Sequence, residues 1–210
     1  AYWYAGKLQD VSAKVQAVAG KLGVPVLVVH YAGDAEALAA SLADGRSLEA
    51  LTAPYEAKPV TFVQLPFRHP LYILFSSGTT GVPKCIVHSA GGTLLQHLKE
   101  QRLHCGLVEG DRLFYFTTCG WMMWNWLVSG LALGVTLCLF DGSPFHPDGN
   151  MLFDYAEAEK FTVLGTSAKY IDAVRKSGLA PRATHDLASL RLLASTGSPL
   201  SPEGFSFVYE

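Results

Sequence analysis

The chain has 210 residues, of which half are hydrophobic and 16% are charged, and its formal net charge is −2. This composition excludes a disordered chain and predicts one domain with a sizeable core, or two small domains. The near balance of charge provides no basic surface for nucleic acid or for an anionic membrane, so we expect neither as a partner.

Cysteine and histidine are too scattered to suggest a disulfide framework or a metal site. The four cysteines include no C-x-x-C pair, and the seven histidines include no H-E-x-x-H motif. We therefore predict reduced thiols, no protein-held metal and a cytoplasmic location. The sequence also starts without methionine and stops inside a helix expected from Ser201, so we expect a fragment of a longer protein.

Residues 1–65 alternate between helical and extended patterns, which predicts a lead-in segment of helix, strand and helix. Asp10 is the expected N-cap of the first helix. The run of β-branched residues that follows predicts a buried parallel strand. The expected elements are a helix over 10–22, a strand over 24–29, a helix over 35–42, a short helix and loop over 45–59, and a short strand over 61–65.

The stretch from Leu71 to Ala90 has the outline of a phosphate-binding loop. Strand-forming residues 71–75 run into Ser76-Ser77-Gly78-Thr79-Thr80-Gly81-Val82-Pro83-Lys84, and the chain is extended again over 86–88. Glycine lets backbone N–H groups approach an anion, hydroxyls donate hydrogen bonds and lysine adds positive charge. The glycine spacing does not fit G-x-x-x-x-G-K-[ST] or G-x-G-x-x-G, which excludes a Walker loop.

The remaining sequence alternates strands and helices as a doubly wound α/β protein does. We predict a layered, mostly parallel β-sheet with helices on both faces. Ligands bind such sheets at the carboxyl ends of strands. The loops after Phe75, Thr118, Phe140, Leu164 and Ala194 are therefore expected along one edge, where they could share one site.

The expected elements beyond the loop are ordered along the chain as follows. The helix from Gly92 to His104 should turn leucines 94, 95, 98 and 103 inward. Later elements are strands over 112–118, 135–140, 162–164 and 190–194, helices over 121–133, 150–160 and 167–176, and a linker over 180–186. Residues 113–140 carry no charge, so a membrane span is an alternative for this stretch. Asn125 and several glycines favour a strand, a buried helix and a strand instead.

The string SSGTTGVPK resembles the phosphate-binding signature of the adenylate-forming enzymes, which include acyl-CoA synthetases, luciferases and peptide synthetase adenylation domains. Cys85 departs from the glycine usual after the lysine. Three further landmarks of the family occur in order: Gly120-Trp121 at the acyl pocket, Gly165 to Tyr170 at a substrate-pocket helix, and Gly197-Ser198-Pro199 against adenine, with serine in place of glutamate. The resemblance implies a partial N-terminal AMP-binding domain, with residues 66–210 forming the phosphate loop and the acyl and adenine pockets.

Roles for individual residues follow from this resemblance. It implies catalytic roles for Lys84 and Thr80 and an acid pocket in the segment TTCGWMMWNW. His88 gates that pocket, pairs with a carboxylate, or is an ordinary hydrogen-bonded core histidine. The tryptophan and methionine cluster is either pocket or core. The ATP-binding residues are expected to be Ser76, Ser77, Gly78, Thr79, Thr80, Gly81, Lys84, Gly197, Ser198 and Pro199. The acid-binding residues are expected to be Trp121, Met123, Trp124, Asn125 and His88.

The segments TTCGWMMWNW and STGSPL are most similar to the branch of the family that activates acetoacetate. The resemblance implies ATP, Mg²⁺ and coenzyme A as cofactors or co-substrates, and a place in lipid and fatty acid metabolism. Acetate and other short acids are alternative substrates, and a non-catalytic nucleotide-binding fragment is an alternative function. The family's later acidic segment and its C-terminal domain with a catalytic lysine are not found in residues 1–210, so we expect this chain alone to be inactive.

Overall fold

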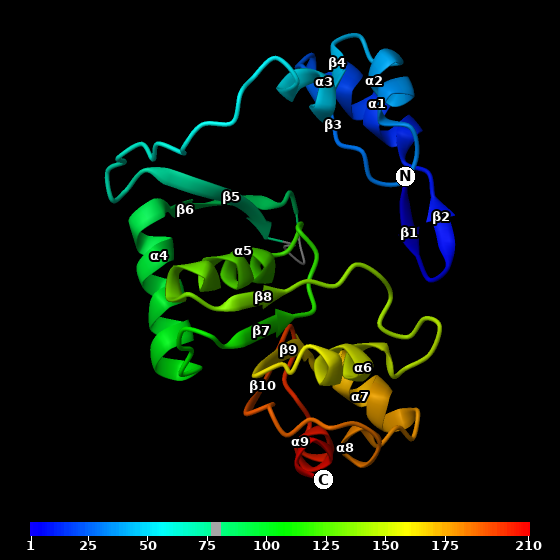
Figure 1. Ribbon diagram of the computed structural model, residues 1–210, viewed down its shortest axis with the longest axis vertical. Helices are drawn as coiled ribbons and strands as arrows, with labels where there is room; N and C mark the ends of the chain where they lie inside the picture. The colour runs from blue at the N-terminus through cyan, green and yellow to red at the C-terminus, as the bar shows by residue number, and fades with distance from the viewer. Residues whose placement is uncertain (77–80) are drawn as a thin grey trace. The chain divides into compact units, whose positions relative to one another are not determined.

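Figure 1 shows the computed structural model of the chain, in which residues 1–76 and 81–210 are described. The chain divides into two compact units. The first comprises Ala1–Phe62 with Phe145–Pro147, and the second comprises Val63–Pro144 with Asp148–Glu210.

The first unit is small and weakly buried. Its only described cluster of buried apolar residues consists of Val28, Ala35 and Ala39. The hairpin β1–β2 and strand β4 were not predicted, because strands of three residues are too short to show an alternating pattern. The elements are β1 (Tyr2–Tyr4), β2 (Lys7–Gln9), α1 (Ser12–Leu22), β3 (Val26–Val28), α2 (Ala35–Ala40), β4 (Gly45–Ser47) and α3 (Leu48–Thr52).

Three expectations for this unit need correction. Strand β3 is parallel to β4 as predicted, but only Val28 of β3 is buried, since this sheet has just two strands. Helix α1 begins after Val11 instead of Asp10, whose carboxylate accepts hydrogen bonds from Ser12, and no residue of α1 is buried. Residues 61–65 form no strand.

The second unit begins with a hairpin followed by a long helix (Figure 1). Strands β5 (Pro70–Ser76) and β6 (Lys84–Ser89) pair antiparallel, with Ser76 opposite Lys84. The placement of this first strand in the parallel sheet was therefore wrong. Only residues 77–83 separate the strands, whereas a parallel pair needs a crossover of about a dozen residues or more. Helix α4 (Ala90–Leu98) follows and continues into a π-helix, η1 (Lys99–His104).

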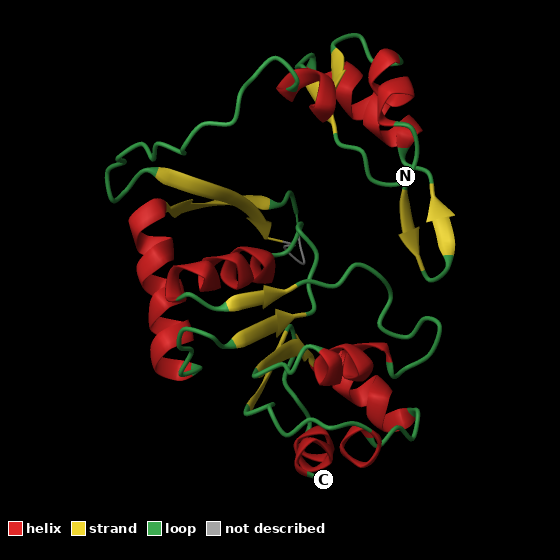
Figure 2. Ribbon diagram, viewed as in Figure 1, coloured by secondary structure: helices red, strands yellow, loops and turns green. Residues whose placement is uncertain are grey.

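A four-stranded parallel sheet forms the centre of the second unit, as the sequence predicted (Figure 2). Its strand order is β10-β9-β7-β8. Thr162 to Leu164 and Leu190 to Ala194 were placed correctly as strands, although each observed strand ends two or three residues later. The strands are β7 (Arg112–Tyr115), β8 (Thr136–Cys138), β9 (Val163–Ser167) and β10 (Leu192–Thr196).

Helices pack on both faces of this sheet, which confirms the predicted α/β class. Leu113 and Tyr115 point toward one face and pack with Trp126 and Leu127, whereas Phe114 points toward the other face. This alternation is the period of two expected of a strand covered on both sides. The helices are α5 (Met122–Ser129) with the 3₁₀ turn η2 (Gly130–Leu133), α6 (Met151–Ala158), α7 (Ala168–Lys176), α8 (Pro181–Thr184) and α9 (Pro202–Tyr209).

The charge-free run over residues 113–140 is divided between β7, α5, η2 and β8. No helix in the described part of the chain combines the length and the apolar character needed to cross a membrane. The linker expected over 180–186 instead contains α8, which begins at Pro181, a residue suited to the first turn of a helix.

Candidate functional site

The carboxyl ends of the four parallel strands lie along one edge of the sheet. Tyr115 is opposite Gly165, and Ser167 is opposite Thr196. The loops after β7, β8, β9 and β10 therefore start from a common edge, as expected, while the loop after Phe75 belongs to the separate hairpin. Open α/β sheets bind their ligands at this edge.

The loop after β10 begins with exposed residues, whereas the segment after β9 begins with a capped helix. After β10, Gly197 has a φ of 92°, a conformation that favours glycine, and Gly197, Ser198 and Pro199 are all exposed. After β9, Ser167 caps α7 by accepting a hydrogen bond from the Tyr170 N–H at 3.2 Å. The predicted adenine-binding residues therefore follow directly from the sheet edge.

The expected phosphate loop connects the two strands of the hairpin. Ser77, Gly78, Thr79 and Thr80 lie outside the described residues. Of the remaining loop residues, Gly81 has a φ of 103° and Lys84 is exposed at the start of β6. Lys84 takes part in no ion pair within the described parts of the chain, so its charge is available to an anion.

The tryptophan and methionine segment is divided between surface, core and cavity. Trp121 precedes α5 and is 67% exposed. Met123 and Trp124 pack against the core on the sheet face that α5 covers, and the Asn125 carbonyl accepts a hydrogen bond from Ser129. These four expected acid-binding residues lie outside the lining of the cavity beside α5.

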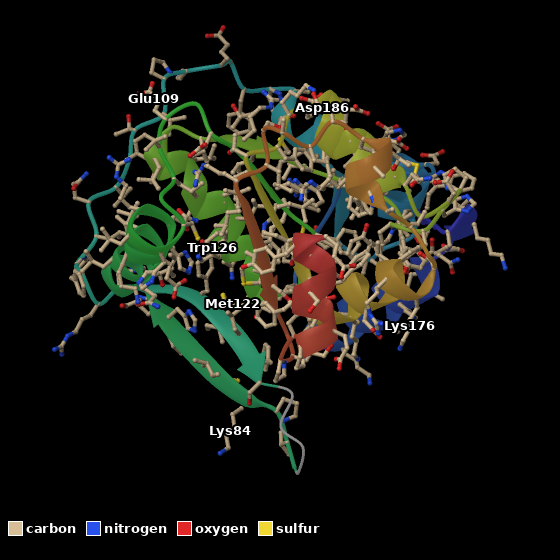
Figure 3. All side chains as sticks on the ribbon, turned by 90° about the horizontal axis from the view of Figure 1, so that it is seen from below. Lys84, Glu109, Met122, Trp126, Lys176 and Asp186 are labelled. Carbon is tan, nitrogen blue, oxygen red and sulfur yellow. The ribbon has the colours of Figure 1, made fainter. Side chains whose placement is uncertain are left out.

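That cavity of about 250 Å³ lies between α5, helix α4 with η1, and the end of β6. His88 is the expected acid-binding residue that the structure places in its wall, together with Met122 and Trp126 of α5. In Figure 3, Met122 lies between Lys84 and Trp126 in the view. Met122 and Trp126 are four residues apart on one helix, so they line the same face of α5. The wall formed by α4 and η1 includes Thr93, Gln96, His97 and Glu100.

Polar contacts fix the side of the cavity where α4 meets α5. The Glu100 carboxylate accepts from the Gln96 amide at 2.6 Å and from the Trp126 indole N–H at 3.0 Å. The Gln101 amide donates to the Trp126 carbonyl at 2.5 Å. The Thr93 hydroxyl is buried and has no partner among the described residues. The wall is therefore ordered and still has unused hydrogen-bonding capacity.

His97 also lies in this wall. Burial lowers the pKa of His97, the Glu100 carboxylate opposes this shift, and the nearby His88 lowers the pKa further. The Ser129 hydroxyl lies 2.8 Å from His97 Nδ1 and donates its single hydrogen to the Asn125 carbonyl. His97 Nδ1 must therefore carry the hydrogen, which leaves Nε2 as an acceptor.

This wall was not predicted, because the leucines of α4 were expected to face inward. Leu94, Leu95 and Leu103 are instead 48%, 62% and 75% exposed. The buried residues of α4 and η1 are Thr93, His97 and Gln101, spaced four residues apart. A polar stripe at that spacing within an otherwise apolar helix is the signal that could have identified it.

The chain belongs to the AMP-binding enzyme family, with which residues 6–210 match. It is 73% identical over 209 residues to an acetoacetyl-coenzyme A synthetase of Rhizobium meliloti (strain 1021), a match that covers 100% of this chain and 32% of the relative. A mouse (Mus musculus) acetoacetyl-CoA synthetase is 53% identical over 154 residues, which are 73% of this chain and 23% of that protein.

Two further comparisons extend this result. A malonamoyl-CoA synthetase of Penicillium aethiopicum is 46% identical over 169 residues, covering 74% of this chain and 23% of the relative. The structure of an acetoacetyl-CoA synthetase from Streptomyces lividans matches with a TM-score of 0.87 and 45% identity, over 99% of this chain and 31% of that chain. The chain thus spans about a third of the length of its relatives, and its fold is that of the matching part of an acetoacetyl-CoA synthetase.

Proposed function

We propose that this chain forms part of the nucleotide- and acid-binding region of a ligase that activates acetoacetate with ATP and transfers it to coenzyme A. The observation that carries this proposal is the 73% identity to the Rhizobium meliloti synthetase over the whole chain. The arrangement of strand ends, glycine turns and Lys84 along the sheet edge and hairpin supports it.

The reaction has two steps. The carboxylate oxygen of the acid attacks the α-phosphorus of ATP and the bond to the β-phosphate oxygen breaks, giving an acyl adenylate and pyrophosphate. The thiol of coenzyme A then attacks the acyl carbon, a thioester forms, AMP leaves and the thiol proton passes to solvent. The first step needs groups that neutralise the charge of the leaving pyrophosphate.

The exposed Lys84 ammonium and the N–H of Gly81 are suited to that charge, and we assign them, with Ser76, Ser77, Gly78, Thr79 and Thr80, to the ATP phosphates. Gly197, Ser198 and Pro199 are assigned to the adenine. Mg²⁺ enters with ATP as part of the substrate, because Mg²⁺ is commonly held by substrate phosphates with few protein ligands.

The acid is proposed to occupy the cavity beside α5, with His88 in its wall and Trp121, Met123, Trp124 and Asn125 on the helix segment that borders it. The names of two relatives indicate acetoacetate and malonamate, and both acids have a carbonyl at the third carbon. Malonamate is therefore the second candidate substrate. The free cysteines favour a cytoplasmic location. The similarity to acetoacetyl-CoA synthetases is the basis for placing the enzyme in fatty acid and lipid metabolism.

Acid-dependent exchange between ATP and pyrophosphate tests the proposal. It should be measured with acetoacetate, malonamate, acetate and butyrate. Two proteins are compared: residues 1–210 alone, and a full-length chain in which residues 1–210 replace the matching third of the Rhizobium meliloti synthetase, below called the full-length chimera. We expect exchange only in the chimera, strongest with acetoacetate.

Other results would change the proposal in different ways. Strong exchange by residues 1–210 alone would contradict their expected inactivity. Exchange strongest with another acid would keep the family and discard acetoacetate as the substrate. A folded chimera without exchange on any acid would refute the proposed ligase function.

A further inference from the structure

One carboxylate, that of Glu100, connects the two sides of the cavity beside α5. Glu100 lies at the junction of α4 and η1, and both of its oxygens accept hydrogen bonds. One oxygen holds the Gln96 amide and the other holds the Trp126 indole, which belongs to a different helix. Glu100 therefore fixes two lining side chains that the sequence places thirty residues apart.

Gln96 is oriented by this contact. An ionised carboxylate only accepts hydrogen bonds, so the nitrogen of the Gln96 amide must face Glu100. An amide nitrogen carries two hydrogens, and the second has no partner among the described residues. Because Gln96 lines the cavity, this second N–H is a held donor for a ligand oxygen.

Trp126 provides an apolar wall of the same cavity. Its side chain is 5% exposed, it packs against Tyr115 with ring centroids 5.9 Å apart, and its N–H is bound to Glu100. The indole is held by packing on one side and by a hydrogen bond to a carboxylate on the other, so a change of its rotamer costs free energy. It therefore sets a fixed limit to the length of a ligand beside α5.

Charge decides how an acid would lie in this cavity. The wall formed by α4 and η1 carries the Glu100 carboxylate, which repels a second carboxylate. The carboxylate of the acid is therefore directed away from Glu100, and the other end of the acid faces Gln96 and Trp126. At about 250 Å³ the cavity is below the range of about 300–1,000 Å³ usual for drug-sized ligands, which suits an acid of few atoms.

We propose that the Gln96 amide donates a hydrogen bond to the 3-oxo oxygen of the acid, and that Glu100 is the positioning residue that holds both this donor and the Trp126 end wall. This inference rests on the proposed function and assigns acid selectivity to residues 96, 100 and 126.

The test compares acetoacetate with butyrate, which lacks the 3-oxo oxygen, in the full-length chimera. Gln96→Leu removes the donor from an exposed side chain, and should lower the ratio of kcat/KM for acetoacetate to that for butyrate about tenfold. Glu100→Gln keeps the shape but can accept only one of the two hydrogen bonds, so it should lower the same ratio while butyrate exchange persists. Glu109→Gln, an exposed glutamate outside the cavity, is the matched control and should leave the ratio unchanged (Figure 3).

Trp126→Leu tests the end wall separately. Shortening this side chain should raise the relative kcat/KM for hexanoate over butyrate about tenfold or more. An unchanged acetoacetate to butyrate ratio in Gln96→Leu, or equal loss of both acids in Glu100→Gln, would overturn the inference while leaving the ligase intact. Absence of exchange in the unsubstituted chimera would instead refute the proposed function, which keeps the two failures distinguishable.

Discussion

The parallel sheet and the β5–β6 hairpin are both built from apolar, strand-forming residues, yet they differ sharply in burial. Leu113, Phe114 and Val163 of the sheet are fully buried, whereas Ile73 and Phe75 of the hairpin are 58% and 68% exposed. The difference arises because helices cover both faces of the sheet, while in this chain the apolar side chains of the hairpin remain accessible. We infer that the sheet supplies stability and that the hairpin supplies ligand contacts.

The largest expected effect is on the stability of the sheet. Phe161 is fully buried and stacks on Phe114 with ring centroids 4.8 Å apart. Phe161→Ala should lower the free energy of unfolding by about 3–5 kcal/mol, because it leaves a cavity between β9 and α6. Phe75→Ala in the hairpin is the matched variant and should cost less than about 1 kcal/mol. Urea denaturation of the 210-residue chain measures both, and similar losses would break the comparison.

The next effect concerns catalysis and not stability. Lys84→Ala in the full-length chimera should slow acid-dependent pyrophosphate exchange about a hundredfold, because a charge on the departing phosphates is removed. The melting temperature should stay constant, since Lys84 is exposed at the start of β6. Lys21→Ala, another exposed lysine, serves as the control. Exchange that is equally fast in both variants would show that Lys84 has no part in the reaction.

A smaller loss of stability is expected where a strand and an aromatic ring approach closely. A Cβ added to Gly165 would overlap the ring of Tyr115, whose hydroxyl donates to the Thr166 carbonyl at 3.1 Å. Gly165→Ala should therefore cost about 1–3 kcal/mol. Gly20→Ala, on a helix with open space around the added carbon, should instead raise stability by about 0.5–1 kcal/mol. Opposite signs in thermal or chemical denaturation would support this account.

The last effect depends on pH. The Asp111 carboxylate accepts from the Val108 N–H at 2.8 Å and from Arg191 at 2.6 Å. Burial raises the pKa of Asp111, but these hydrogen bonds outweigh it and leave the pKa below its ordinary value of 3.8. A depressed folded-state pKa stabilises the protein above the unfolded value, and this stabilisation is lost as pH falls through the folded value.

Asp111→Asn should therefore destabilise the chain by about 1–3 kcal/mol at pH 7. The difference between the two proteins should begin to narrow as pH falls below the unfolded pKa of 3.8, and it should continue to narrow as pH falls through the lower folded pKa, where the carboxyl of the folded protein becomes protonated. Unfolding by urea at pH 7, 5 and 3 measures this trend. A difference that stays constant across that range would contradict a role for the ionised carboxylate.

The sequence allowed the parallel sheet to be predicted because its strands are continuous apolar runs separated by clear helical periods. It did not reveal that β5 pairs with β6 alone, because apolar character does not specify a pairing partner. The expectation that the leucines of α4 face inward was wrong for a similar reason. Periodicity identifies an apolar face of a helix but not the element that packs against it. Four of the five predicted edge loops start from the edge of the parallel sheet, and the loop after Phe75 does not. The polar cavity wall depends on contacts between α4 and α5 that no local pattern contains.

The contacts between η1 (Lys99–His104) and Trp126 depend on the number of residues in this π-helical segment. A π-turn holds one more residue than an α-turn, and it brings consecutive residues Glu100 and Gln101 against the same tryptophan. Deleting one residue from this segment would restore ordinary winding, and Glu100 and Gln101 would then no longer both contact Trp126. This segment should therefore tolerate substitution far better than a change in length.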